Sequence, residues 1–151
     1  MKIEIQIRKM VEKDIAQVME IDQQTFSSPW TEDIFIYEIT ENNYGHYFVV
    51  ETNDTIIGYV GIWIVHEDAQ ITNIAILKQY RGYKIGEKLF GYAMQYAYKL
   101  GAERLSLEVR VSNIVAQNMY RKFGLVPGGI RKKYYTDDNE DALVMWVSLY
   151  E

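Results

Sequence analysis

Alternating apolar and polar residues mark several strand-like segments of this chain. In 2–9, Ile3, Ile5 and Ile7 lie on one side, which is the pattern of a half-buried strand. The turn at 52–55 predicts a hairpin between the segments on either side of it. Similar patterns and apolar runs predict six more strands, over 46–51, 56–65, 68–77, 104–111, 125–127 together with 130–135, and 142–149.

Four other segments repeat their apolar residues every three or four positions, as amphipathic helices do. Thr31, followed by Glu32 and Asp33, is typical of a capped helix start. Gly101 is suited to the end of the third helix. The predicted helices run from Asp14 toward Phe26, from Thr31 toward Asn42, from Ile85 to Leu100, and from Ser112 or Asn113 to Gly124.

This order of strands and helices predicts an α/β fold. We expect a mixed, mostly antiparallel sheet of about seven strands with helices on both faces. With 151 residues, the chain is long enough for one domain with a real core. We therefore expect a single domain over 1–151.

Composition excludes several classes of protein. The chain is 48% hydrophobic and 25% charged, as soluble globular proteins are. It has no apolar run near the ~18 residues of a membrane span, and its alternating start is unlike a signal peptide. With no cysteine, disulfides and thiol nucleophiles are excluded, and we expect a cytoplasmic protein with no membrane association. A net charge of −5 argues against direct nucleic-acid binding.

Common catalytic motifs are missing from the sequence. His46 and His66 share no ligand spacing with carboxylates, so we expect no metal. There is no P-loop motif and no G-x-S-x-G elbow. The basic, glycine-bearing segment 78–84 lies between a predicted strand and a predicted helix, where backbone N–H groups and the helix dipole favour an anion. From the residues alone, a solvated strand–helix connection is the favoured interpretation of this segment.

A possible acid–base pair remains. Glu108 lies in mid-strand on the face opposite Leu107 and Val109, and burial there would strengthen it as a base. The alternative is a solvent-facing carboxylate paired with Arg110 or a lysine. Tyr120, on the following helix, is either a proton donor or a core tyrosine with its hydroxyl at the rim.

Taken together, these segments resemble the GNAT superfamily of acyl-CoA-dependent N-acyltransferases over essentially the whole chain. The segment 81–86 resembles its cofactor loop, R/Q-x-x-G-x-G/A, with Arg81 and Gly86 matching and Lys84 in place of the first glycine. A lysine there must point away from the phosphates or reach one of them. The resemblance implies that acetyl-CoA is bound by Ile74, Ala75, Ile76, Arg81, Gly82, Tyr83, Lys84, Ile85, Gly86, Glu87 and Asn113.

Two further stretches, 107–125 and 134–145, resemble the RimI-type subgroup, which acetylates the N-terminal alanine of a small-subunit ribosomal protein. This resemblance implies that Glu108 is the general base and Tyr120 the general acid. The alternative for Trp30 is a plug in the core between two helices. By the same resemblance, the peptide is bound by Pro29, Trp30, Asn73, Tyr134 and Tyr135.

The resemblance implies an N-terminal protein acetyltransferase that works by direct attack in a ternary complex, as a monomer or weak dimer. Acidic residues near the expected peptide groove would attract a basic N-terminal tail. They are Glu32, Asp33, Asp137 and Asp138. Two alternatives stay open, a lysine side-chain or small-amine acetyltransferase and a catalytically silent CoA-binding subunit.

Overall fold

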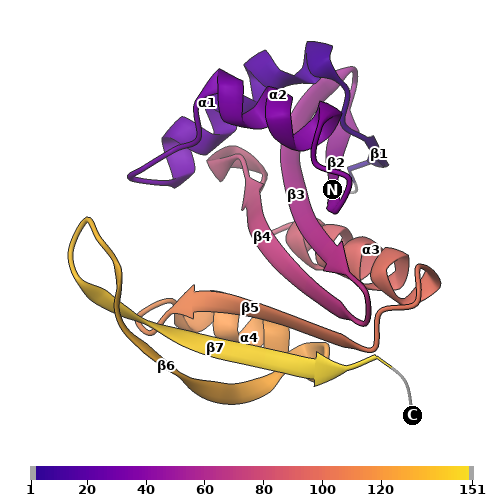
Figure 1. Ribbon diagram of the computed structural model, residues 1–151. Helices are drawn as coiled ribbons and strands as arrows, with labels where there is room; N and C mark the ends of the chain where they lie inside the picture. The colour runs from indigo at the N-terminus through magenta and orange to yellow at the C-terminus, as the bar shows by residue number, and fades with distance from the viewer. Residues whose placement is uncertain (1–2, 150–151) are drawn as a thin grey trace.

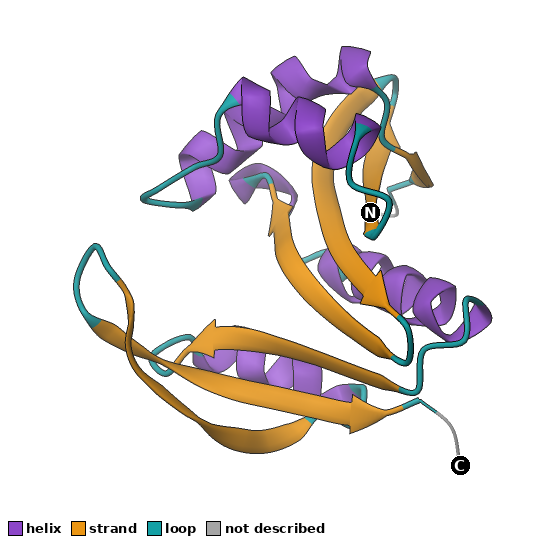
Figure 2. Ribbon diagram, viewed as in Figure 1, coloured by secondary structure: helices purple, strands orange, loops and turns teal. Residues whose placement is uncertain are grey.

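The computed structural model describes residues 3–149. Its strands and helices follow one another in the order that the sequence predicts (Figures 1 and 2). Two short 3-10 turns, η1 and η2, lie at Glu12–Asp14 and Lys78–Tyr80. The strands are β1 (Gln6–Lys9), β2 (Gly45–Thr52), β3 (Thr55–Val65), β4 (Asp68–Ile76), β5 (Arg104–Arg110), β6 (Val126–Tyr135) and β7 (Glu140–Ser148). The helices are α1 (Ile15–Thr25), α2 (Glu32–Thr40), α3 (Ile85–Lys99) and α4 (Ile114–Lys122).

The seven described strands form one sheet in the order β1-β2-β3-β4-β5-β7-β6. Every paired neighbour is antiparallel except β4 and β5, which run parallel. The mixed, mostly antiparallel sheet is therefore confirmed. A parallel pair needs a crossover connection, and α3 supplies it.

Strand ends differ from the sequence prediction where an edge tolerates irregular backbone. β6 runs without a break from Val126 to Tyr135, so it joins the two predicted pieces and includes Pro127. Proline cannot donate to a ladder, but β6 is an edge strand, where one N–H is not needed. A bulge between Pro127 and Gly129 resets the pairing with β7. At the other end, β1 begins at Gln6, and the predicted Lys2 lies outside the described residues.

Two hydrophobic clusters lie on opposite faces of the sheet, and helices cover both (Figure 1). On one face, α1 and α2 bury Val18, Ile21 and Phe35 against β2 and β3. On the other, α3 and α4 bury residues such as Leu89 and Phe90. Because successive side chains of a strand alternate between faces, β2 contributes to both clusters.

Helix starts follow local capping chemistry. The Thr31 hydroxyl accepts a hydrogen bond from the Ile34 N–H at 3.3 Å, as its position predicted. For α4 the sequence left two candidates, and the structure selects Asn113, whose side chain accepts from the Ala116 N–H at 3.2 Å. Each cap satisfies a backbone donor that the first helical turn leaves free.

The parallel pair separates soon after it begins. Pairing of β4 with β5 covers only Asp68 to Gln70 on the first strand and Arg104 to Ser106 on the second. A bulge in the β3–β4 ladder follows at once, at Thr72. Bulges bend a strand and increase its twist, so β4 curves away from β5. Figure 1 shows the two strands diverging toward their carboxyl ends.

Candidate active site

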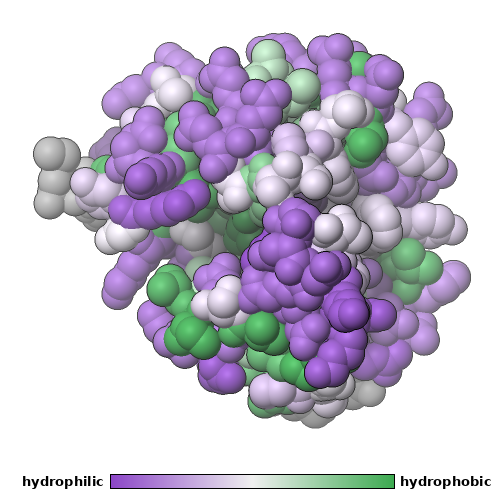
Figure 3. All heavy atoms as spheres, turned by 90° about the vertical axis from the view of Figure 1, so that its left-hand side faces the viewer, coloured by the Kyte–Doolittle hydropathy of each residue, from purple (hydrophilic) through white to green (hydrophobic). Residues whose placement is uncertain are grey.

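A pocket of about 640 Å³ occupies the space between the diverging strands. Its walls come from 71–74 on β4 and 107–110 on β5, and its remaining sides from the α1–α2 loop, α4 and the β6–β7 hairpin. Figure 3 shows the side of the molecule that carries the α1–α2 loop and the β6–β7 hairpin, where hydrophilic residues surround an apolar recess. Of the predicted site residues, the pocket is lined by Trp30, Asn73, Ile74, Glu108, Asn113, Tyr120, Tyr134 and Tyr135.

Glu108 points from β5 into this pocket, with 12% of its side chain exposed. One carboxylate oxygen accepts a hydrogen bond from Gln70 Nε2 at 2.9 Å, and the other accepts from Arg131 Nε at 3.1 Å. Arg110, the arginine that the sequence offered as a partner, binds other carboxylates instead. Glu108 is therefore mostly buried and bound on both oxygens, and it still borders the pocket.

Tyr120 reaches the same pocket from α4. It is 6% exposed, and its ring packs against Phe90 with centroids 5.1 Å apart. Burial, with a smaller contribution from the nearby Tyr135, raises the pKa of the Tyr120 hydroxyl to about 12. The hydroxyl is therefore neutral at physiological pH and can donate a proton or a hydrogen bond.

Two loops bring aromatic residues to the pocket. Trp30 lines it and also packs edge-on against Phe35 in the α1–α2 core, with centroids 5.2 Å apart. Both interpretations of Trp30, as a core plug and as a pocket residue, are therefore compatible with its position. Pro29 is exposed beside it and does not line the pocket. On the β6–β7 side, the rings of Tyr134 and Tyr135 lie 5.1 Å apart at nearly a right angle.

Arg110 organises the acidic hairpin between β6 and β7. Its guanidinium binds Asp137, Asp138 and Glu140 at 3.0 to 3.1 Å and lies 4.1 Å from the Tyr135 ring centroid. Three carboxylates around one cation leave this region acidic. Of the four acidic residues expected near a peptide groove, only Asp137 lines the pocket; Asp138 lies beside it, and Glu32 and Asp33 are exposed at the start of α2.

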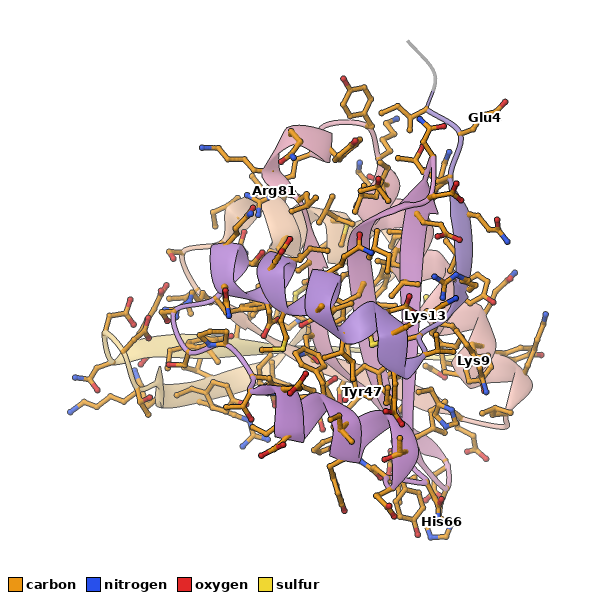
Figure 4. The ribbon with its side chains drawn as sticks, turned by 90° about the horizontal axis from the view of Figure 1, so that it is seen from above. Glu4, Lys9, Lys13, Tyr47, His66 and Arg81 are labelled. Atoms are coloured by element: carbon orange, nitrogen blue, oxygen red, sulfur yellow. The ribbon has the colours of Figure 1, made fainter. Side chains whose placement is uncertain are left out.

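The basic loop lies at the start of α3, outside the lining of the pocket. Lys84 is exposed at the N-cap with φ 63°, a left-handed conformation that favours the glycine it replaces. Arg81 donates to the Ile76 carbonyl at 3.0 Å, which fixes the loop to the end of β4. In Figure 4, Arg81 and His66 lie at opposite ends of the view. Glu87 pairs with Lys122 on α4 at 2.6 Å.

Alternate backbone N–H groups of β4 face the edge at which β4 has separated from β5. The Leu77 N–H donates to the Ile57 carbonyl on β3 at 2.8 Å. Since successive residues of a strand point their N–H groups to opposite edges, the N–H groups of Ile74 and Ile76 are directed toward the β5 side. Ala75 differs from them, because its side chain is buried in the α1–α2 cluster and its backbone faces β3.

Sequence reasoning missed three residues that shape this site. Gln70 and Arg131 bind Glu108, and Asp22 lines the pocket from α1 while only 1% exposed. Asp22 accepts hydrogen bonds from the Tyr59 hydroxyl and, at 2.9 Å, from the Trp30 N–H. The sequence did contain a signal for Asp22, because its carboxylate lies four residues after Val18 on the apolar face of a helix. No local pattern marks Gln70 or Arg131.

Comparison with known proteins identifies the family. The model of the acetyltransferase (GNAT) family matches residues 15–125. The chain belongs to the GNAT family of acetyltransferases. Members transfer an acetyl group from acetyl-CoA to an amine, so this acetyltransferase is an acetyl-CoA-dependent enzyme.

Relatives match the acetyltransferase over most of its length. It is 55% identical to a Bacillus subtilis protein over the full 151 residues of both chains. That protein carries the provisional name ribosomal protein bS18-alanine N-acetyltransferase. A Haemophilus influenzae protein of the same name is 34% identical over 138 residues, 87% of this chain and 90% of that one. The crystal structure of the Escherichia coli ribosomal-protein-S18-alanine N-acetyltransferase superposes with a TM-score of 0.89 at 27% identity, covering 98% of this chain and 96% of that chain.

Within residues 3–149, no group of three or more His, Cys, Asp or Glu side chains is placed to hold a metal ion. Over the same residues, no helix is both long and apolar enough to cross a membrane.

Proposed function

We propose that this acetyltransferase modifies the α-amino group of a protein N-terminus, and that its substrate is the N-terminal alanine of ribosomal protein bS18. The names of the B. subtilis and H. influenzae relatives support this substrate, and the full-length match at 55% identity carries most weight. The observation in the structure that supports it best is one pocket holding Glu108, Tyr120 and the tyrosine pair 134–135 together.

The residues present suit acetyl-CoA. The start of α3 directs its first N–H groups and the positive end of its dipole at segment 81–86, which suits a pyrophosphate. Gly86 lies in the first turn of that helix, and a side chain built there would meet no atom closer than 3.8 Å. Arg81 and Lys84 add positive charge. When bound, acetyl-CoA supplies an activated thioester to the pocket.

Glu108 serves as the general base. A protein α-amino group has a pKa near 8, so it needs little help to lose its proton. A carboxylate that borders the pocket can take that proton directly or through water. An N–H group of Ile74 or Ile76, directed toward the separated edge of β4, is suited to stabilise negative charge on a carbonyl oxygen during attack.

Tyr120 serves as the general acid. Its pKa of about 12 keeps the hydroxyl protonated, so it can give a proton to the leaving sulfur. The chain has no cysteine, which excludes a cysteinyl acyl-enzyme. Direct transfer between two bound substrates follows as the simplest course.

The proposal is tested by thiol release from acetyl-CoA with short peptides. The panel contains a basic peptide that begins with alanine, an N-blocked copy of it, a lysine-only peptide and spermidine. We expect turnover with the free alanine-started peptide alone. Glu108→Gln and Tyr120→Phe should each lower kcat by about 10²-fold or more.

Each other outcome overturns part of the proposal. Turnover with the lysine-only peptide or with spermidine would show that the substrate is a lysine side chain or a small amine instead of a protein N-terminus. No turnover with any amine, while acetyl-CoA still binds, would favour a silent CoA-binding subunit. Full activity of either variant would remove the role assigned to that residue.

A further inference from the structure

Glu108 is held from two sides, by residues of different strands. Gln70 is the last residue of β4 that pairs with β5, where it lies opposite Ser106. Glu108 is the next residue on the same face of β5, so the Gln70 amide reaches it across the point where the strands separate, at 2.9 Å. From β6, Arg131 reaches the second carboxylate oxygen at 3.1 Å. Neither partner lines the pocket, whereas Glu108 does.

We infer that Gln70 and Arg131 are positioning residues that hold the Glu108 carboxylate aimed into the pocket, an inference that rests on the proposed function. Both partners donate a hydrogen, and an ionised carboxylate accepts such bonds better than a protonated one. With both oxygens bound, rotation of the carboxylate is restricted. The base is therefore held toward the pocket in a fixed orientation.

The two partners contribute differently. Gln70 is half-buried and fixed by the β3–β4 ladder, in which it lies opposite Trp63. It orients the carboxylate without adding charge. The Arg131 side chain is 58% exposed, and water weakens an ion pair of this kind. Arg131 therefore supplies a modest positive charge that a lysine at the same position could partly replace.

Other ionisable groups around Glu108 do not supply this charge. Burial raises the pKa of the Tyr134 and Tyr135 hydroxyls on β6, and the charge of Glu108 contributes a smaller part, so both hydroxyls are neutral near pH 7. Arg110, farther along β5, is surrounded by three carboxylates. The remaining groups that border the pocket are Asp22 on α1, Tyr120 on α4 and Asp137 in the hairpin.

The test is the pH dependence of kcat at saturating acetyl-CoA and alanine-started peptide, since this profile reports groups in the enzyme–substrate complex. Arg131→Gln should move the midpoint of the acid limb upward by about 0.5 pH unit, with kcat on the plateau within about twofold of wild type. Arg131→Lys should restore most of the shift. Gln70→Glu, which is nearly isosteric and places a second carboxylate beside Glu108, should move the midpoint upward by about 1 unit or more.

Lys132→Gln is the matched control. Lys132 is the next residue on β6 and pairs with Asp141, so its loss removes the same charge without touching Glu108. Its acid limb should coincide with that of wild type. A shift in Lys132→Gln equal to that in Arg131→Gln would reduce the effect to net charge and overturn the inference.

Two failures are distinguishable. If Glu108→Gln is inactive while Arg131→Gln and Gln70→Glu leave the midpoint unchanged, the positioning role is wrong and the proposed function stands. If Glu108→Gln is fully active, the proposed base is wrong, and the inference fails with it. Because Arg131 is exposed, Arg131→Gln keeps the test open if Gln70→Glu does not fold.

Discussion

The Ser27 hydroxyl donates a 2.6 Å hydrogen bond to the Asp137 carboxylate, which joins the α1–α2 loop to the β6–β7 hairpin across 110 residues of sequence. Both residues line the pocket. Asp137 is also held by Arg110. The two loops that carry Trp30 and the tyrosine pair 134–135 are therefore connected to each other at one edge of the pocket.

Breaking this connection should loosen peptide binding. We expect Ser27→Ala to raise KM for the alanine-started peptide by about 3- to 10-fold, the loss of roughly one hydrogen bond, with kcat within twofold. Thr40→Ala is the control, because Thr40 donates a similar bond to a backbone carbonyl within α2, away from the pocket. Equal KM values for Ser27→Ala and wild type would show that the connection does not order the peptide site.

Peptide binding should depend little on the protonation of Asp137 near neutral pH. Hydrogen bonds from Ser27 first, then Arg110, lower the pKa of Asp137 to about 2. A lowered carboxyl pKa stabilises the fold above the unfolded value near 4, and this contribution is lost as the pH falls toward 2. Peptide KM should therefore not rise through protonation of Asp137 between pH 8 and pH 5. A rise in wild type that Asp137→Asn abolishes would contradict this.

Asp22 should affect stability in the opposite direction. Burial raises its carboxyl pKa, although hydrogen bonds from Tyr59 and Trp30 oppose the shift. A raised carboxyl pKa contributes stability that is present below the unfolded value near 4 and is lost as the pH rises through the folded value. Asp22→Asn cannot ionise. Urea unfolding at pH 5 and pH 8 should therefore show a smaller difference in free energy for Asp22→Asn than for wild type.

Two comparisons complete that experiment. Asp54→Asn, in an exposed turn between β2 and β3, should preserve the wild-type difference. Asp22→Ala should cost about 1–3 kcal/mol at either pH, because the Tyr59 hydroxyl and the Trp30 N–H lose their acceptor. If Asp22→Asn kept the wild-type difference, another group would cause the pH dependence.

Substitutions at two glycines allow effects on folding and on cofactor binding to be measured separately. A Cβ at Gly61 would overlap the Tyr47 ring and lie 2.6 Å from Thr72 Oγ1 at the β4 bulge, so Gly61→Ala should destabilise the protein by about 2–4 kcal/mol. At Gly86 the nearest atoms are 3.8 Å away. Gly86→Ala should therefore melt at or above the wild-type temperature.

For Gly86→Ala, KM for acetyl-CoA should nevertheless rise at least fivefold, because the methyl group is added in the first turn of α3, whose N–H groups form the proposed phosphate site. The reading of segment 81–86 as an anion site would be wrong if Gly86→Ala were both stable and unchanged in KM for acetyl-CoA.

Much of the fold was predictable because its signals are local. Alternation along β5, helical spacing in α3 and the Thr31 cap each lie within a few residues of sequence, and each agrees with the structure. β6 was predicted as two pieces, because the bulged segment that joins them depends on being at the edge of the sheet. That position is set by the order of strands and by no residue within β6 itself.

The site was predictable only where a family motif covers it. Glu108 and Tyr120 were found as isolated residues, and their shared pocket depends on how far β4 and β5 stay paired. The Gln70–Glu108 bond joins residues 38 positions apart, and it depends on the register in which β4 and β5 pair across the α3 crossover. The second partner of Glu108, Arg131, lies on a third strand, β6. No window of sequence contains this information.

The most direct test of the account is the position of the acetyl group on a peptide that offers two amines. An alanine-started basic peptide with one internal lysine is incubated with enzyme and acetyl-CoA, and tandem mass spectrometry locates the modification. We predict a single acetyl group on the α-amine of the alanine, formed at least 10²-fold more slowly by Glu108→Gln. Acetylation of the lysine, or an N-terminal product formed at the wild-type rate by Glu108→Gln, would contradict the account.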